Sequence, residues 1–218
     1  MLVSIGVINY NNGEYLERAI RSCQNQFRGS HNVEIIVVDD SSTDDSVPLL
    51  QQFKDSITLI LNDENKGAGY SAQKALENSR GKYFIRLDSD DFLSQFATGV
   101  FVNFLEENHL FDFVFGDLQV VDKFGRKLEV IDMSSRENLI NHGAGILFRK
   151  EVLDKLGGYD ISLRHGEDID LMLRLLMNGK MHQHLPLRYY RYYRHDKNKS
   201  DTIEHANAKI DLREKYGF

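Results

Sequence analysis

The chain has 218 residues, 41% of them hydrophobic and 28% charged, which is typical of a single globular domain, residues 1–218, with a sizeable core. Its formal net charge of −6 argues against nucleic acid as a partner, because an acidic surface repels phosphate backbones. With one cysteine, no apolar run near the roughly 18 residues of a transmembrane segment and no signal-peptide pattern, we expect a cytoplasmic protein without an internal disulfide.

The first half of the chain alternates strands with helices. Apolar runs predict strands over 2–8, 33–39, 57–62 and 83–88. Helical periodicity and helix-start residues predict helices within 9–27, 41–53 and 67–81. Alternation of this length is typical of parallel βαβ units, so we predict an α/β fold with a mostly parallel central sheet flanked by helices.

The second half has a less regular pattern. In chain order, it predicts a helix within 92–107, two strands within 111–133, a strand and a short helix over 145–158, a helix over 167–179, an extended segment over 181–200 and a helix over 202–217. These elements extend the same domain, because no linker-like stretch separates the two halves.

Polar residues follow three of the predicted strands. They are residues 9–11, the pair Asp39 and Asp40, and the acids between 88 and 91. Ligands of parallel α/β sheets bind at the carboxyl ends of the strands. We therefore expect the three groups to converge on one cleft.

Residues 88–91 hold three carboxylates, those of Asp88, Asp90 and Asp91, with only Ser89 between them. Such acids repel one another unless a positive group lies among them. Because Mg²⁺ and Mn²⁺ prefer oxygen ligands and also take diphosphate oxygens, the motif predicts a divalent-metal site. The alternative is a solvated acidic turn whose Asp91 or Ser94 caps the next helix.

The pair Asp39 and Asp40 ends a buried strand. Two acids there can accept hydrogen bonds from a nucleotide base or from ribose hydroxyls. The alternative is a helix start, capped by one of the hydroxyl residues 41–43 with acids in its first turn. Capping explains Asp39 and Asp40 less well, since they belong to the strand end.

A glycine-rich segment supports a competing interpretation. Residues 67–72 match the dinucleotide-binding pattern G-x-G-x-x-A, and Asp88 follows Gly67 by 21 residues, near the expected spacing of about 20. This pattern would indicate an NAD(P)- or flavin-dependent oxidoreductase. The intervening polar residues 63–66 argue against it, because the motif should follow its strand in a tight turn. The further acids after Asp88 would also crowd a ribose.

Two later segments carry candidate chemistry. Glu167 and Asp168 begin a predicted helix, where acids either favour the helix dipole or, in an anionic cleft, serve as a general base. The segment 188–200 interleaves arginine with tyrosines that we expect to face the core. His195 beyond them is either an ordinary loop residue or a nitrogen ligand of the metal.

Taken together and in this order, the segments resemble glycosyltransferase family 2, a group of inverting nucleotide-sugar transferases. The resemblance covers almost the whole chain. It rests on the first strand with NYNNGEYLERAIRS and on VVDDSSTDDS, NKGAGYSAQKAL, GKYFIRLDSDD, GILFRKEVLDKLGGYD, GEDIDLMLRL and YYRHDKNKS. It implies the Rossmann-like GT-A fold, with a nucleotide-sugar-binding half over 1–91 and an acceptor-binding and catalytic half over 92–218.

The resemblance also implies residue roles. Tyr10 and Asp40 would lie against the nucleotide base, and Asp88 would contact the ribose or the diphosphate. Asp90 would bind Mn²⁺ or Mg²⁺, and His195 would reach the metal or the diphosphate. Asp168 would be the catalytic base. The other implied site residues are Asn11, Asp39, Asn65, Gly67 and Ser89 toward the nucleotide sugar, and Glu167 and Arg194 on the acceptor side.

The function implied is metal-dependent, inverting transfer of a sugar from a nucleotide-diphosphate sugar, with UDP-sugar favoured. The acceptor would be a hydroxyl of a glycan, a lipid-linked sugar or another molecule, in glycan or polysaccharide synthesis. Peripheral membrane association is compatible with this role, and the oligomeric state is left open. Gln73 and Lys74 stand where family members often have Arg-Asn, so a non-catalytic sugar-nucleotide-binding module is the alternative.

Overall fold

Residues 1–27, 29, 31–196, 198 and 202–217 are described in the computed structural model. The first half forms β1 (Leu2–Asn9), α1 (Gly13–Gln24), β2 (Asn32–Asp39), α2 (Ser46–Gln51), β3 (Thr58–Leu61), α3 (Ala68–Glu77) and β4 (Tyr83–Asp88). The second half forms β5 (Phe92–Leu93), α4 (Ala97–Glu107), β6 (Phe113–Val121), β7 (Lys127–Ile131), α5 (Arg136–Asn141), β8 (Leu147–Arg149), α6 (Lys150–Lys155), α7 (Glu167–Met177), β9 (His182–Tyr193) and α8 (Ile203–Tyr216).

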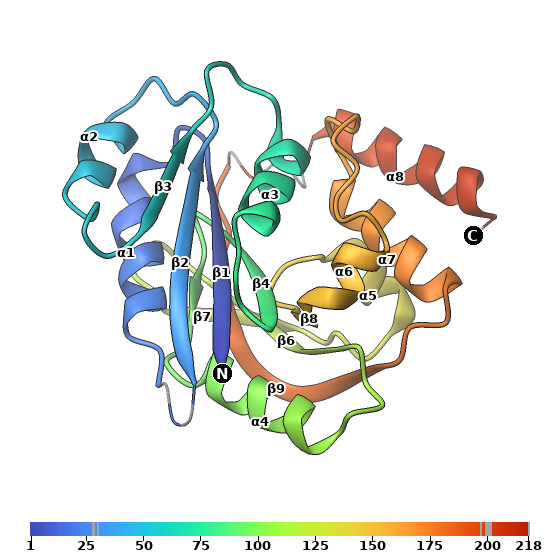
Figure 1. Ribbon diagram of the computed structural model, residues 1–218. Helices are drawn as coiled ribbons and strands as arrows, with labels where there is room; N and C mark the ends of the chain where they lie inside the picture. Colours follow the sequence, from blue (N-terminus) through green and yellow to red (C-terminus); the bar gives the residue numbers. More distant parts are fainter. Residues whose placement is uncertain (28, 30, 197, 199–201, 218) are drawn as a thin grey trace.

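Strands β1 to β4 form the parallel part of the sheet. β1 pairs with β2 on one side and with β4 on the other, and β2 pairs with β3, all in parallel. α1 and α2 lie to one side of these strands and α3 to the other (Figure 1). This is the predicted βαβ arrangement, and it brings the carboxyl ends of β1, β2 and β4 to one edge.

The rest of the sheet runs in mixed directions. Among the described residues the sheet has nine strands in the order β3-β2-β1-β4-β8-β6-β9-β5, with β7 beside β6. β8 is antiparallel to β4 and β6, whereas the long β9 is parallel to β6 and antiparallel to β5. Strands β6 and β9 therefore run in the same direction as β1–β4, and only β5, β7 and β8 run the opposite way, which agrees with the expected mostly parallel sheet.

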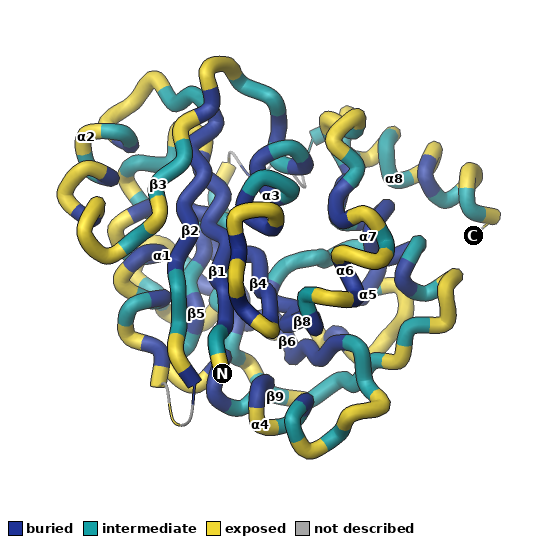
Figure 2. The backbone as a smooth tube through the Cα atoms, in the orientation of Figure 1, coloured by how far each residue is buried: buried dark blue, intermediate teal, exposed yellow. Residues whose placement is uncertain are grey.

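The core follows the middle of this sheet. β1, β4 and β6 are buried along almost their whole length (Figure 2). Phe84, Phe113 and Phe148 are among the largest fully buried side chains, and Leu16 and Cys23 of α1 are also fully buried. The buried strands hold the carboxyl-end loops rigidly. Within the described ranges, none of the helices has the length and apolar character needed to cross a bilayer.

The helix starts and ends differ from the sequence expectations in two places. α3 ends at Glu77 rather than at Gly81. Gly81 instead packs on β1, where an added Cβ would lie 2.5 Å from the Ser4 hydroxyl. α4 begins after Phe96, so neither Asp91 nor Ser94 caps it. α5 was not among the predicted elements.

The long strand β9 bends where it crosses β6. The register between the two strands shifts between Gly116 and Leu118, opposite a stretch of β9 that contains Pro186. Proline has no N–H to donate to the ladder, which favours an irregular pairing there. An added Cβ at Gly116 would lie 2.2 Å from the Leu187 carbonyl oxygen. The bend carries the end of β9 to β5 and to the carboxylate loop, residues 88–91.

Gly116→Ala should destabilise the protein by about 1–3 kcal/mol, because the methyl group must push the two backbones apart. Equilibrium unfolding in urea would measure the change in the midpoint. An unchanged midpoint would mean that β6 and β9 do not approach as closely as described.

Candidate active site

A cavity of about 400 Å³ lies at the carboxyl ends of β1 and β4. One wall comes from residues 8–12 and from the carboxylate loop. The opposite wall comes from residues 141–144 after α5, from the start of α7 and from His205 in the first turn of α8. The convergence expected for residues 9–11, Asp40 and the carboxylate loop is therefore present.

Arg86 is the buried cation of this cavity. Its Nε atom donates to Asp88 Oδ1 at 2.9 Å, and its Nη1 atom donates to Glu167 Oε1 at 2.8 Å. Burial alone would lower the pKa of Arg86, but the charges of Asp88 and Glu167 outweigh burial and raise that pKa well above its usual value. Arg86 thus joins the carboxylate loop to the start of α7.

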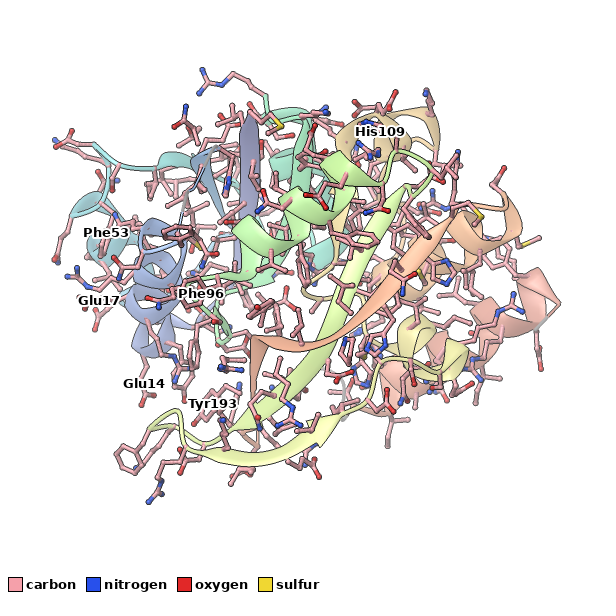
Figure 3. The ribbon with its side chains drawn as sticks, turned by 90° about the horizontal axis from the view of Figure 1, so that it is seen from below. Glu14, Glu17, Phe53, Phe96, His109 and Tyr193 are labelled. Carbon is pink, nitrogen blue, oxygen red and sulfur yellow. The ribbon has the colours of Figure 1, made fainter. Side chains whose placement is uncertain are left out.

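Asp90 faces His195 across the loop. Asp90 Oδ2 lies 3.0 Å from His195 Nε2. The His195 ring stacks on Tyr193 with the ring centroids 4.9 Å apart, and Tyr193 packs against Tyr15 of α1. Figure 3 shows Tyr193 near α1 and the β6–β7 hairpin. Two ligands about 2.1 Å from one octahedral ion, at right angles, lie about 3.0 Å apart, so this pair fits a Mg²⁺-like ion.

Arg18 of α1 lies against the same loop. Its Nη2 atom donates to the Asp90 carbonyl oxygen at 2.7 Å. Its guanidinium carbon lies 4.5 Å from the Phe92 ring centroid and 5.2 Å from that of Tyr193. Burial lowers the pKa of Arg18, and the nearby charge of Asp91 opposes that change. Arg18 therefore fixes the loop backbone and brings a second positive charge to it.

Asp91 has a structural role. Its Oδ2 atom accepts from the Tyr190 hydroxyl at 2.6 Å, and its Oδ1 atom accepts from the Tyr193 backbone N–H at 2.7 Å. Burial raises the pKa of Asp91 well above its usual value, and the charges of Asp90 and Asp88 raise it further. Both carboxylate oxygens are engaged, so Asp91 ties the loop to β9.

Asp39 and Asp40 also hold the edge of the sheet together. Asp39 accepts from the side chain of Asn9 at 2.7 Å and from the Ser42 backbone N–H at 2.9 Å. Asp40 accepts from Asn62 Nδ2 at 2.8 Å and from the Gly67 N–H at 2.8 Å. The alternative of a helix start capped by residues 41–43 is wrong, because α2 begins at Ser46 with Asp45 at its N-cap position. Asp39 instead holds the turn at Ser42, while Asp40 fixes the loop before α3 and still lines the cavity.

Asp168 and Glu167 differ although they are adjacent. Glu167 is buried and bound to Arg86. Asp168 is half-buried and lines the cavity, with its Oδ2 atom 3.4 Å from the Gly143 N–H. An added Cβ at Gly143 would lie 2.3 Å from Asp168 Cβ, so a side chain there would displace the acid. Burial raises the pKa of Asp168, and the charge of Glu167 raises it further.

The other predicted site residues divide into two sets. Tyr10, Asn11 and Ser89 line the cavity. The set that does not line it is Asp39, Asn65, Gly67, Arg194 and His195, which reaches the site through its contact with Asp90. Arg164, which does line it, donates to the carbonyl and side-chain oxygens of Asn65. Arg194 forms an exposed ion pair with Glu129 of β7, 2.5 Å long.

The unusual pair on α3 lies outside the cavity wall. Gln73 Oε1 accepts from the Tyr159 N–H at 2.9 Å, and Gln73 Nε2 donates to Glu77. Lys74 Nζ donates to Asn62 Oδ1 at 3.3 Å, beside the Asp40 contact. The pair therefore supports the walls of the cavity instead of lining it.

Sequence reasoning missed the cations that hold the acids. Arg86 lies inside a strand that is otherwise buried and apolar, and a charge at such a position is rare unless it is paired. An arginine at this position in the sequence could therefore have indicated a buried ion pair. Arg18 gave no such signal, because its spacing on α1 is compatible with an exposed face. Asn9 was also not assigned, although it lines the cavity with a buried Oδ1 atom that lacks a hydrogen-bond partner among the described residues.

A second group of metal-ligating side chains lies away from the cavity. The ligand atoms of Asp117, Asp132 and His184 come within 4.8 Å of one another. Asp117 Oδ1 accepts from His184 Nε2 at 2.7 Å and from the Met133 N–H at 3.1 Å. These bonds tie β9 and the segment after β7 to β6, and they explain the group as a structural contact.

Two solved structures share this fold. TarS from S. aureus in complex with UDP-GlcNAc has a TM-score of 0.81 and 19% identity over 99% of this chain and 65% of its own. PcManGT, a mannosyltransferase from Pyrobaculum calidifontis in complex with GDP-Man and Mn²⁺, has a TM-score of 0.74 and 17% identity over 98% of this chain and 63% of its own. The fold is the GT-A fold of glycosyltransferases.

The sequence defines the family within that fold. The model of glycosyl transferase family 2 matches residues 4–157, and the chain belongs to this family. Over 186 residues it is 32% identical to the Escherichia coli UDP-Glc:alpha-D-GlcNAc-diphosphoundecaprenol beta-1,3-glucosyltransferase WfaP, covering 82% of this chain and 71% of that protein. The chain spans between 54% and 77% of the length of three curated relatives.

This membership overturns the oxidoreductase interpretation of residues 67–72. In the structure the segment is preceded by the loop after β3, and Gly67 donates its N–H to Asp40. The glycines therefore serve the start of α3 and its contact with the edge of the sheet, where Gly67 has φ 95°.

Arg86→Met should destabilise the protein by about 3–5 kcal/mol, because it leaves Asp88 and Glu167 buried without a counter-charge. The loss of unfolding free energy in this variant should become smaller as the pH falls, since protonation of Asp88 and Glu167 removes the uncompensated charges. Urea unfolding at pH 7 and at pH 5 would measure it.

Arg80→Met is the matched control. Arg80 pairs with Glu34, but the arginine side chain is 78% exposed. Exposed ion pairs contribute about 0–1 kcal/mol, so this variant should change little at either pH. Equal effects of the two substitutions would contradict the assigned role of Arg86.

Proposed function

We propose that the chain transfers a sugar from a UDP-sugar to a hydroxyl group of a glycan acceptor in polysaccharide biosynthesis, with inversion at the anomeric carbon. The observation that carries this proposal is the division of the acids in one cavity. Glu167 is neutralised by Arg86, whereas Asp168 faces the cavity opposite the carboxylate loop. A base and a diphosphate-binding loop on opposite walls are what a direct displacement requires.

The donor side of the cavity is assigned to β1, β2, β4 and their carboxyl-end loops. TarS has been solved with UDP and with UDP-GlcNAc, which supports a uridine nucleotide here. Tyr10, Asn11 and Asp40 line this wall. The buried Oδ1 atom of Asn9 is an acceptor that an N–H of the base would satisfy.

Asp90 and His195 are the residues we assign to a divalent ion, with Asp88 beside them. Their 3.0 Å separation fits two adjacent positions around one ion, and carboxylate and imidazole suit Mn²⁺. The neighbour PcManGT was solved with GDP-Man and Mn²⁺. When bound, such an ion neutralises the charge of the leaving diphosphate. Arg18 and the stack of His195 on Tyr193 hold both side chains in place.

In the reaction, Asp168 accepts the proton of the acceptor hydroxyl. The acceptor oxygen forms a bond to the anomeric carbon from the face opposite the nucleotide, and the bond between that carbon and the diphosphate oxygen breaks. Nucleoside diphosphate leaves with the bonding electron pair. One base suffices, because no covalent intermediate forms.

The metal assignment predicts that UDP binds poorly without a divalent ion, since carboxylates and diphosphate repel each other. Mn²⁺ should tighten UDP binding at least tenfold, a gain that Asp90→Asn should lose. Calorimetric titration of UDP with and without Mn²⁺ measures this. Asp55→Asn, an exposed acid after α2, is the control and should behave as the unchanged protein. Equal UDP affinity with and without Mn²⁺ would remove the ion from the proposal.

Asp168→Asn should lower the transfer rate by about 10²–10⁴-fold while UDP–Mn²⁺ affinity is retained. Because burial raises the pKa of Asp168, the rate should fall as the pH drops through a value above the usual 3.9 or so of an aspartate, where the base becomes protonated. Rates of sugar transfer across pH and calorimetry on the same preparations test both statements. A variant with the full rate would show that the base lies elsewhere. A chain that binds UDP–Mn²⁺ but never transfers sugar would be a binding module.

A further inference from the structure

Histidines gather on the wall of the cavity that faces the carboxylate loop. His142 follows α5, His165 precedes α7 and His205 lies in the first turn of α8, and all three line the cavity. Within the described part of the chain, no hydrogen bond or ion pair engages the ring of His142 or of His205. Two imidazoles with free N–H groups thus face the space beside Asp168.

The surroundings of these two histidines are positive. His205, Lys209 and Arg213 recur every four residues on α8, so they share one face of the helix. Burial lowers the pKa of His142, and the charges of Lys209, His205 and Arg194 lower it further. Lys209 and Arg213 thus make this part of the wall locally positive, although the net charge of the chain is −6.

Two acids near this wall are already engaged with cations. Glu137 of α5 accepts from Arg213 at 2.6 Å and lies 3.8 Å from Lys209. Glu129 pairs with Arg194. Asp168 also lies near this wall, and the charge of His205 lowers its pKa. In the proposed reaction this carboxylate accepts the proton of the acceptor hydroxyl. With its pKa lowered, His142 presents an uncharged ring to the cavity, and no carboxylate of the described residues is hydrogen-bonded to that ring.

The position of the histidine wall indicates that it contacts the acceptor and not the donor. Gly143, next to His142, directs its N–H toward Asp168 Oδ2. The acceptor hydroxyl must reach that same carboxylate, whereas the diphosphate of the donor belongs to the carboxylate loop on the other wall. In the described chain, the three ring systems do not converge within 4.8 Å as the Asp117 group does, so they do not form a metal centre.

We propose that His142 and His205 form an acceptor subsite for a phosphate group carried by the acceptor next to its reactive sugar or polyol. The inference rests on the proposed transferase function. Imidazole N–H groups donate to phosphate oxygens, and the positive charges of Lys209 and Arg213 offset the repulsion that the cavity acids exert on a phosphate. A neutral glycan would leave the positive charge that Lys209 and Arg213 carry in excess of their shared partner Glu137 without a counter-charge.

The test is binding of small phosphates while UDP–Mn²⁺ saturates the donor site. Octyl diphosphate represents a lipid-linked acceptor, a diester of two glycerols with one phosphate represents a polyol-phosphate chain, and glycerol is the phosphate-free control. We expect at least one phosphate probe to bind and glycerol not to bind. His142→Gln and His205→Gln should each lower the affinity for the phosphate probe by about tenfold or more, because each removes a hydrogen bond to a charged group.

His109→Gln is the matched control, because His109 is exposed beyond α4 and away from the cavity (Figure 3). It should bind the probes as the unchanged protein does. Thermal unfolding confirms that the variants fold. The probe that binds more tightly identifies the source of the phosphate.

The subsite proposal is wrong if the phosphate probes bind no more tightly than glycerol. It is also wrong if the His142→Gln and His205→Gln variants bind the probes as tightly as the unchanged protein. The UDP–Mn²⁺ titration in the same samples separates this failure from that of the proposed function. Intact UDP–Mn²⁺ binding without phosphate binding leaves the transferase proposal standing. Phosphate binding through His142 and His205 without UDP–Mn²⁺ binding would keep the subsite and reject the donor.

Discussion

The structure of the cavity depends on the positive charge of Arg86, which neutralises the carboxylates of Asp88 and Glu167. This side chain is buried between Asp88 at the end of β4 and Glu167 at the start of α7, with both contacts under 3 Å. A buried charge is costly to leave unpaired, so the three groups must assemble together. Because β4 and α7 belong to different halves of the chain, one ionic cluster fixes the geometry of both halves.

The same requirement divides the acids by role. Asp91 is held by Tyr190 and the backbone of β9, and Glu167 is held by Arg86. Asp90 and Asp168 line the cavity, and among the described residues no arginine forms an ion pair with either carboxylate. Adjacent acids thus acquire different chemistry from their partners, since a carboxylate already bound to a cation is a poor base and a poor metal ligand.

Glycine and aromatic residues set the remaining distances. Gly143 allows the segment after α5 to approach Asp168, and Gly116 allows β9 to bend toward the carboxylate loop. Tyr193 at the end of that bend then stacks on His195 and places it against Asp90. The proposed metal pair therefore depends on the irregular pairing of β6 with β9 at Gly116 and Pro186.

The sequence alone determined the parallel first half, because apolar runs and helical periodicity are local and the central strands β1 and β4 are buried on both faces. It also located the polar edge, since strand ends in such a sheet always meet at one side. The partners of the acids were decided only by the tertiary structure. Arg18 and Arg86, the difference between Glu167 and Asp168, and the histidines opposite them depend on contacts between distant segments. Charge compensation has no sequence period, so the pairing of these residues emerges only when the chain is folded.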